Sequence, residues 1–370
     1  MTQTDPFEIF LVVQPGLEQV LADEARALGF ANPKPVPGGV ETKGDWAEVW
    51  RANLQLRGAT RVLVRIGAFR VFHLAQLDKR ARKFPWAETL RKDVPLRVEV
   101  TCKKSKIYHA KAAAQRIEKA LSEELGAPLD PKAELCVRVR IEDDLCTISL
   151  DTSGEMLHKR GHKAAVGKAP MRESMAALFL RQAGYAGQEP VVDPMCGSGT
   201  FVIEAAEIAA GLHPGRSRSF AFENLASFDA KAWEEMRAGE APQPTDLRFY
   251  GSDRNTGAID MSRANAERSG VADLTQFTPH AVSDLQRPDG PPGLVIVNPP
   301  YGGRIGNKKL LYALYASFGQ VLKERFSGWR AAIITTEAGL AKATNLPLLP
   351  PGPPVAHGGL KVRLFQTGPL

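Results

Sequence analysis

A short apolar run followed by Asn-Pro-Pro-Tyr-Gly is the segment of this sequence best suited to chemistry. Residues 294–302 read Leu-Val-Ile-Val-Asn-Pro-Pro-Tyr-Gly, and the apolar part predicts a buried parallel strand, beyond whose carboxyl end ligands bind in open α/β sheets. Asn298 offers a side-chain carbonyl and Pro299 a main-chain carbonyl, while Pro300 has no N–H to donate. An exocyclic ring amine could donate both hydrogens to these acceptors and stack on Tyr301. The alternative is a turn in which Asn-Pro-Pro only ends the strand.

A glycine-rich turn lies about a hundred residues earlier in the chain. Residues 190–200 read Pro-Val-Val-Asp-Pro-Met-Cys-Gly-Ser-Gly-Thr, which predicts a strand, a tight turn and a helix over 201–210. Gly197 and Gly199 allow the backbone to approach a ligand closely. The third glycine of a dinucleotide fingerprint is absent, and no phosphate-cradling loop motif occurs. Asp193 at the strand end therefore favours a ligand with an ammonium group rather than a pyrophosphate. We call residues 193–200 the glycine loop.

A third strand end carries another acid. Residues 247–253 predict a strand ending in Asp253, which could accept hydrogen bonds from a ribose diol, and residues 256–269 predict the helix that follows. Asp193 and Asp253 lie 60 positions apart, whereas nucleotide-binding βαβ units usually place the acid about 20 positions on. We interpret the extra length, residues 211–246, as an inserted and partly helical segment beside the site.

The order of these motifs resembles the class I S-adenosylmethionine-dependent methyltransferases, in the branch that methylates amino groups. The resemblance implies a doubly wound, Rossmann-like α/β fold, S-adenosylmethionine as cofactor, and a catalytic tetrapeptide that positions the target amine. The catalytic residues that it implies are Asn298, Pro299, Pro300 and Tyr301. The implied cofactor-binding residues are Asp193, Pro194, Met195, Cys196, Gly197, Gly199, Thr200, Asp253, Arg254, Asp284 and Asn298.

The composition favours a cytoplasmic enzyme without a metal centre. The chain has 370 residues, of which 44% are hydrophobic, enough for two or three domains with their own cores. No apolar stretch approaches the roughly 18 residues of a membrane span, and the first residues do not resemble a secretory signal. Four scattered cysteines without a C-x-x-C pair argue against a disulfide framework or a zinc site. We expect Cys196 to fill space in the glycine loop rather than to act as a nucleophile.

The positive charge is concentrated in the middle of the chain. Residues 51–172 hold 26 Lys and Arg against 14 Asp and Glu, whereas residues 173–370 hold 19 of each. Clustered cations interleaved with aromatic side chains are typical of nucleic-acid binding, although a solvated basic face is the alternative. The predicted RNA-binding residues are Lys79, Arg80, Arg82, Lys83, Lys103, Lys104, Lys106, Tyr108, Lys159 and Arg160.

The middle of the chain resembles the THUMP domain, an RNA-binding module found beside RNA-modifying enzymes. The residues that carry this resemblance are 105–109, 115–117, 148–154 and 157–161. The last of these leads into residues 169–174, which resemble the family's run-in helix over the cofactor pocket. We predict an α+β ferredoxin-like domain over 1–58, a THUMP domain over 59–155, a linker over 156–170 and the methyltransferase domain over 171–370.

Taken together, the motifs resemble the bacterial 23S ribosomal RNA guanine-N2 methyltransferases over nearly the whole chain. The implied reaction is methyl transfer to the exocyclic N2 amine of guanine in RNA, with ribosomal RNA favoured over transfer RNA. A transfer RNA enzyme of the same architecture, a DNA adenine-N6 or protein-glutamine methyltransferase, and a non-catalytic RNA-binding assembly factor are the alternatives.

Overall fold

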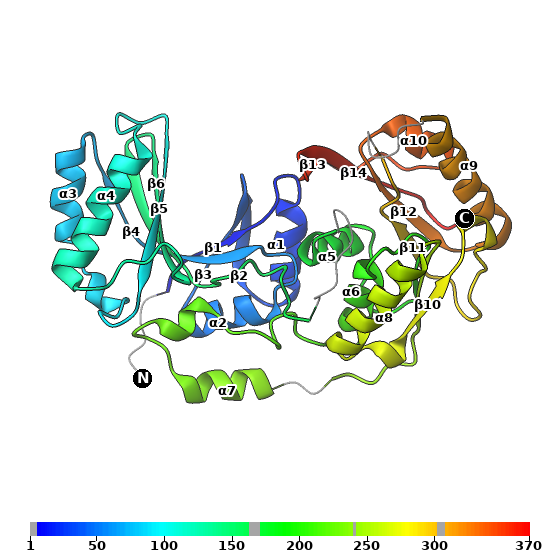
Figure 1. Ribbon diagram of the computed structural model, residues 1–370, viewed down its shortest axis with the longest axis horizontal. Coiled ribbons are helices and arrows are strands. Elements are labelled where there is room, and N and C mark those ends of the chain that lie inside the picture. The colour runs from blue at the N-terminus through cyan, green and yellow to red at the C-terminus, as the bar shows by residue number, and fades with distance from the viewer. Residues whose placement is uncertain (1–5, 163–170, 240–241, 302–307) are drawn as a thin grey trace. The chain divides into compact units, whose positions relative to one another are not determined.

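The computed structural model describes residues 6–162, 171–239, 242–301 and 308–370. These residues form two compact units (Figure 1), which we describe separately. The first unit contains the described parts of residues 1–13, 22–157 and 218–240, and the second contains those of 14–21, 158–217 and 241–370. The predicted linker, 156–170, lies partly outside the described residues, and so does the final glycine of the Asn-Pro-Pro-Tyr-Gly motif.

The first unit is built on one seven-stranded sheet in the order β2-β3-β1-β4-β7-β6-β5. Its strands are β1 (Phe7–Val12), β2 (Ala31–Val36), β3 (Gly39–Gly44), β4 (Arg61–Arg70), β5 (Leu96–Lys103), β6 (Leu135–Glu142) and β7 (Leu145–Asp151). β4 pairs antiparallel with β1 on one side and with β7 on the other. The boundary predicted between residues 58 and 59 therefore falls within a single continuous sheet, because β4 joins the two predicted domains.

The helices of the first unit begin where side chains can cap them. They are α2 (Trp46–Gln55), α3 (Leu74–Arg82) and α4 (Ala110–Ala120), with α1 (Glu18–Ala27) divided between the units. The Asp45 side chain accepts a hydrogen bond from the main-chain N–H of Glu48 at 3.0 Å, as expected of an N-cap. His73 and His109 cap α3 and α4 in the same way through their ring nitrogens. α3 and α4 pack together (Figure 1).

The inserted segment, residues 211–246, is partly helical as predicted and is divided between the two units. Residues 218–239 belong to the first unit and contain α7 (Ala230–Ala238). Their aromatic rings pack onto α2: Phe222 stacks on Trp50 with ring centroids 6.0 Å apart, and Trp233 meets Phe222 edge-on at 4.9 Å. Residues 218–239 thus bury their aromatic rings in the core of the first unit, whereas residues 211–217 and 242–246 belong to the second unit, which contains β8 and β9.

The second unit contains a second seven-stranded sheet in the order β10-β9-β8-β11-β12-β14-β13. Its strands are β8 (Val191–Asp193), β9 (Phe249–Asp253), β10 (Thr275–Pro279), β11 (Leu294–Val297), β12 (Arg330–Thr335), β13 (Val355–His357) and β14 (Leu360–Gln366). β10, β9, β8, β11 and β12 run parallel, while β14 is antiparallel to β12. Every residue of β8 and β11 is buried, as expected of short apolar strands at the centre of a parallel sheet.

Helices alternate with these parallel strands. They are α5 (Glu173–Gln182), α6 (Thr200–Ala209), α8 (Thr256–Ser269), α9 (Lys308–Arg325) and α10 (Ala338–Ala343). α6 packs against α5 and α8, while α9 packs against α10 (Figure 1). This α/β architecture agrees with the Rossmann-like fold that the motifs imply. Within the described residues, no helix is both long and apolar enough to cross a membrane.

Candidate active site

A cavity of about 610 Å³ lies at the carboxyl ends of β8, β9 and β11, which are neighbours in the sheet. Each of these strands contributes its following loop to the wall: the glycine loop after β8, Asp253 and Arg254 after β9, and Asn298–Tyr301 after β11. The three motifs therefore meet at one place, because parallel strands end at the same edge of the sheet.

The glycine loop has the tight backbone that its sequence predicts. Gly197 and Gly199 have φ angles of +55° and +82°, in the region that favours glycine. A Cβ added to Gly197 would meet no protein atom within 4 Å, whereas one added to Gly199 would lie 3.1 Å from Ser262. Gly197 therefore leaves open space at the cavity wall for a ligand, while Gly199 is needed for close packing against α8.

Two acids fix the loop from β8 and β9. Asp193 accepts a hydrogen bond from the main-chain N–H of Met195 at 3.1 Å, and Asp253 accepts one from Gly197 at 3.2 Å. Burial raises the pKa of Asp193 to about 8, and nearby Asp253 adds to the increase. A cationic ligand group beside Asp193 would favour its ionised form.

Cys196 is the second ionisable group of the glycine loop, after Asp193. Burial raises the pKa of its thiol well above the ordinary value. The thiol is thus neutral near pH 7, which is the state expected of a residue that fills space rather than of a nucleophile.

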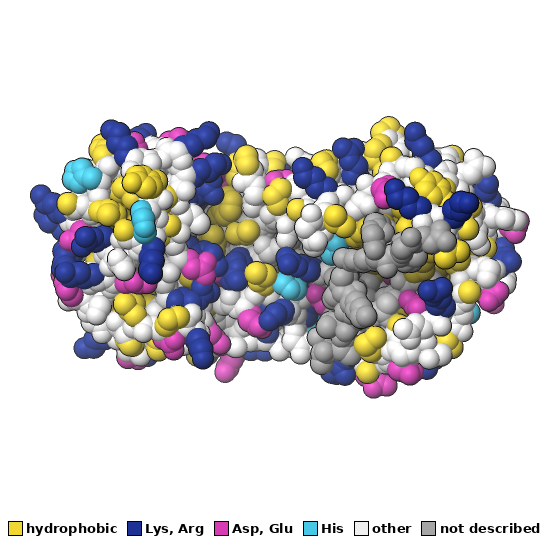
Figure 2. Space-filling view, turned by 45° about the horizontal axis from the view of Figure 1, so that its top comes forward, with side chains coloured by type: hydrophobic (Ala, Val, Ile, Leu, Met, Phe, Trp, Pro, Cys, Tyr) yellow, Lys and Arg dark blue, Asp and Glu magenta, His cyan; other side chains and the backbone are white. Residues whose placement is uncertain are grey.

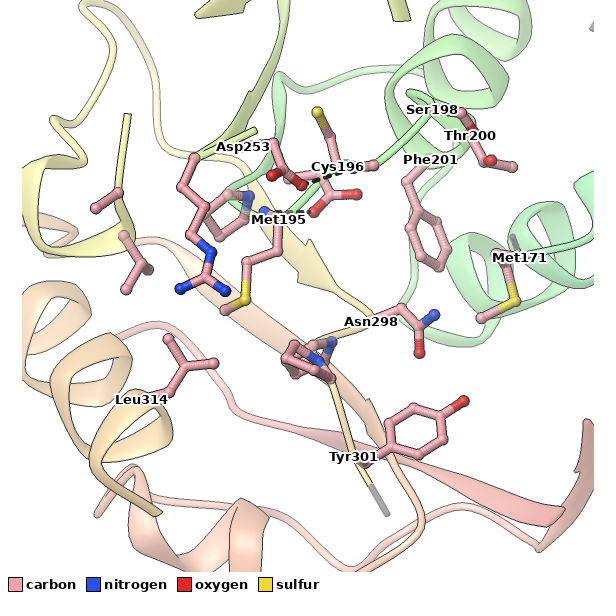
Figure 3. Close-up of a pocket in the computed structure, with 18 of the residues that line it drawn as sticks. Met171, Met195, Cys196, Ser198, Thr200, Phe201, Asp253, Asn298, Tyr301 and Leu314 are labelled. Carbon is pink, nitrogen blue, oxygen red and sulfur yellow. Dashed lines mark hydrogen bonds between the residues drawn. The ribbon is translucent and has the colours of Figure 1, made fainter. Parts of the chain in front are cut away.

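Asn298 presents an acceptor to the cavity. Its Oδ1 atom is buried and receives no hydrogen bond from the residues that the structure describes, although buried polar atoms are almost always paired. Pro299 and Pro300 follow in the cavity wall, and Tyr301 is 3% exposed. Figure 3 shows the Asn298 amide and the Tyr301 ring directed toward the side of the cavity that Met171 and Phe201 line. This arrangement suits a planar group that donates hydrogen bonds from an amine.

A buried tyrosine supports this loop from behind. The Tyr315 hydroxyl, on α9, lies 3.4 Å from the Pro300 carbonyl oxygen and 3.2 Å from Thr335 Oγ1 at the end of β12. Tyr315 is 1% exposed, and its burial raises the pKa of the phenol, so it stays a neutral donor. Tyr315 does not line the cavity, so it acts on the loop backbone.

Two predicted cofactor-binding residues, Asp284 and Gly199, lie outside the cavity wall. Asp284 is exposed and ends a short turn, Val282–Asp284, while His280, Ala281 and Val282 line the cavity in its place. Gly199 does not line the cavity either, because it packs against Ser262 of α8. The other predicted catalytic and cofactor-binding residues line the cavity.

Sequence reasoning missed part of the apolar wall. Met171, Phe201, Leu310, Leu311 and Leu314 line the cavity without belonging to a predicted site. The three leucines lie at the start of α9, whose apolar spacing in Lys-Lys-Leu-Leu-Tyr-Ala-Leu would have predicted a helix.

The predicted RNA-binding residues differ in how far they are exposed to contact RNA. Lys79, Arg80 and Lys83 of the first cluster are exposed, but Arg82 forms ion pairs of 2.6–3.0 Å with Asp78, Glu123 and Glu124. Trp86, one of the aromatic residues that follow this cluster in the sequence, is 2% exposed and donates a hydrogen bond to the Ala81 carbonyl. Arg82 and Trp86 therefore stabilise the first unit itself.

The second cluster is more open. Lys103, Lys104, Lys106 and Tyr108 are all exposed, and Tyr108 retains 84% of its accessible surface. Lys106 Nζ lies 4.8 Å from the centre of the Phe72 ring. Figure 2 shows Lys and Arg side chains at many points of the visible face, with acidic side chains among them.

Arg160 does not suit a direct RNA contact. In the second unit it is 1% exposed, and its guanidinium lies 3.1 Å from the Glu204 carboxylate of α6. The expectation for Arg160 is corrected on this ground, whereas its neighbour Lys159 is exposed.

Comparison with known proteins agrees with this geometry. The model of the RMKL-like methyltransferase domain matches residues 160–347, and that of the RlmL ferredoxin-like domain matches residues 8–63. The chain is 35% identical over 340 residues to the ribosomal RNA large subunit methyltransferase K/L of Aliivibrio fischeri (strain MJ11), covering 88% of this chain and 48% of that protein. The chain thus spans about half the length of this curated relative.

Two solved structures resemble nearly the whole chain. A possible methylase from Clostridium difficile 630 is 28% identical with a TM-score of 0.90, and the match covers 99% of each chain. SMU.472, a putative methyltransferase complexed with SAH, is 26% identical with a TM-score of 0.90 over 100% of this chain and 99% of that one. On the family model and the curated relative, this chain belongs to the family of RMKL-like methyltransferase domains.

Proposed function

We propose that this chain transfers a methyl group from S-adenosylmethionine to the exocyclic N2 amine of a guanine in RNA, most specifically 23S ribosomal RNA. The observation that carries the proposal is the buried Oδ1 of Asn298. A buried acceptor that receives no hydrogen bond from any residue the structure describes indicates a ligand that brings a hydrogen-bond donor.

The residues of the glycine loop fit this cofactor. Asp193 suits the ammonium group of its methionine portion, and Asp253 suits the ribose hydroxyls. Because a Cβ at Gly197 would meet no protein atom, the ligand can approach the backbone there. The SAH complex of SMU.472 supports the same assignment. His280, Ala281 and Val282 are better placed than Asp284 to border the adenine, since they line the cavity and Asp284 does not.

The protein contributes mainly position. S-adenosylmethionine supplies an already electrophilic methyl group, so the residues of this chain need only align a weak nucleophile with it. Asn298 Oδ1 and the Pro299 carbonyl accept hydrogen bonds from the two amine hydrogens. These bonds favour the tetrahedral nitrogen whose lone pair forms the new N–C bond. Tyr301 holds the extruded base by stacking, and the extra proton leaves the alkylated nitrogen readily, so no strong base is required.

Two observations support RNA as the substrate: the name of the curated relative, and a set of exposed cations that lie mainly in the first unit. The relative from Aliivibrio fischeri is named for ribosomal RNA. The exposed cations and aromatic side chain proposed to contact RNA are Lys79, Arg80, Lys83, Lys103, Lys104, Lys106, Tyr108 and Lys159. A bacterial ribosomal RNA substrate would place the enzyme in the cytoplasm.

Transfer of isotope-labelled methyl groups to purified RNA tests this proposal. Transcripts of 23S ribosomal RNA, transfer RNA and duplex DNA are compared, and the modified nucleoside is identified by mass spectrometry. We expect N2-methylguanosine in ribosomal RNA, with no label when the chain carries Asn298→Ala. Label in transfer RNA would change the substrate but keep the chemistry, whereas N6-methyladenine in DNA would overturn the proposal.

A further inference from the structure

Helix α8 carries two buried polar side chains that face the glycine loop. Ser262 is 0% exposed and Asn265 is 1% exposed. Their helix also buries apolar residues such as Ala258, Ile259 and Ala266, which is what packing against a sheet normally requires. A polar side chain at such a position is costly unless it finds a hydrogen-bond partner.

Both side chains find their partner in a carbonyl of the glycine loop. Ser262 Oγ lies 2.9 Å from the Gly197 carbonyl oxygen and 3.0 Å from the Ala258 carbonyl oxygen of its own helix, so its single hydrogen is shared between loop and helix. Asn265 Nδ2 lies 3.0 Å from the Ser198 carbonyl oxygen. Neither side chain lines the cavity. They therefore hold these two carbonyls on the α8 side of the loop without reaching the ligand.

Arg268, one turn further along α8, fixes the direction of the Asn265 amide. The Arg268 guanidinium donates to Asn265 Oδ1 and, through Nε, to the His162 carbonyl at 2.9 Å. Because Oδ1 is occupied by a donor, the amide nitrogen must face Ser198. The amide is thus oriented with its nitrogen toward the loop, where it donates a hydrogen bond to the Ser198 carbonyl.

We propose that Ser262 and Asn265 are positioning residues for the cofactor, which act by holding the glycine loop in its binding conformation. The loop needs such anchors, because glycines at 197 and 199 give its backbone many alternative conformations. Removing a donor would take a hydrogen bond from the half-buried Gly197 carbonyl or from the buried Ser198 carbonyl and allow the loop to rotate. Cofactor binding would then include the cost of reordering the loop.

The experiment measures the affinity of the full chain for SAH (S-adenosylhomocysteine) by calorimetry, with no RNA present. Ser262→Ala removes one donor. Asn265→Asp keeps the shape and the contact with Arg268 but places a carboxylate against the Ser198 carbonyl. We expect each variant to weaken SAH binding by about tenfold. Thermal unfolding of each variant without ligand confirms that it is folded.

Ser269→Ala is the matched control. Ser269 is buried on α8 two turns beyond Ser262, and its hydroxyl bonds to the Ala266 carbonyl instead of the loop. We expect this variant to keep wild-type affinity. Wild-type affinity in Ser262→Ala and Asn265→Asp would overturn the inference, and so would an equal loss in Ser269→Ala.

The inference rests on the proposed assignment of the glycine loop to the cofactor, which Gly197→Leu tests separately. A leucine there would extend into open space at the cavity wall. Unchanged SAH affinity in Gly197→Leu would refute the cofactor site itself. Lost affinity in Gly197→Leu, with unchanged affinity in the α8 variants, would refute only the anchoring role.

Discussion

Cofactor affinity should depend on pH through Asp193. Burial raises the pKa of this carboxyl to about 8 in the ligand-free chain, so most molecules carry a neutral Asp193 at pH 6.5. An ammonium group binds the ionised form, which makes the measured dissociation constant inversely proportional to the ionised fraction. That fraction rises from about 3% at pH 6.5 to about 50% at pH 8, so affinity should increase about 16-fold over this interval.

Calorimetry with SAH across this pH range is the assay, and Asp193→Asn is the perturbation. Asparagine can still accept the Met195 N–H bond but cannot ionise. We expect Asp193→Asn to bind weakly at every pH, with the dependence on pH removed. His280 also lines the cavity and is ionisable, so His280→Gln should retain the full dependence. A flat affinity profile in the wild-type protein would refute this account of Asp193.

The same pKa predicts an opposite trend in the stability of the ligand-free fold. A carboxyl whose pKa is raised on folding contributes stability that is present below its unfolded pKa of 3.8. This contribution is lost as the pH rises toward 8. The unfolding temperature of Asp193→Asn minus that of wild type should therefore be greater at pH 8.5 than at pH 5. The cofactor affinity of the variant should nevertheless be lower than that of wild type.

The remaining predictions concern catalysis and RNA binding. Asn298→Ala should lower kcat about 100-fold or more while SAH affinity stays unchanged, because the lost interaction orients the reacting amine. Near-normal turnover would contradict the role of Asn298. Tyr315→Phe should lower kcat about 5- to 10-fold, since the Pro300 carbonyl loses a donor, while Tyr312→Phe on the exposed side of α9 should not. Three exposed cations lie on α3 and at its C-cap: Lys79, Arg80 and Lys83. Changing them to glutamate should weaken RNA binding, measured by filter binding, and reduce the salt dependence of that binding. The affinity for SAH should not change.

The candidate site was largely predictable from the sequence, because its residues come in short contiguous motifs at strand ends. The residue that follows a buried apolar strand lies at the end of that strand, and the carboxyl ends of parallel strands lie at the same edge of the sheet. Asp193, Asp253 and Asn298 could therefore be brought together without coordinates. Tyr315 and Asn265 could not, since each contacts its loop from a helix whose rotation depends on packing of the whole unit. Asp284 shows the converse error, because a short turn directs it to solvent two residues beyond the cavity wall.

Clusters of charged and aromatic residues in the sequence did not predict which of these side chains are exposed and could contact RNA. The sequence places Arg82, Trp86 and Arg160 in or beside basic clusters that indicate RNA binding. In the structure, Arg82 forms ion pairs with three carboxylates and Arg160 forms one with Glu204. Trp86 is buried and donates a hydrogen bond to the last turn of α3. The inserted segment follows the same logic. Its phenylalanines and Trp233 are too apolar to remain beside a solvent-filled site, so burial against Trp50 in the first unit decides where they lie. Residues 218–239 thus belong to the core of the first unit. The surface of α2 against which they pack lies far away in the sequence, so the local sequence could not predict this position.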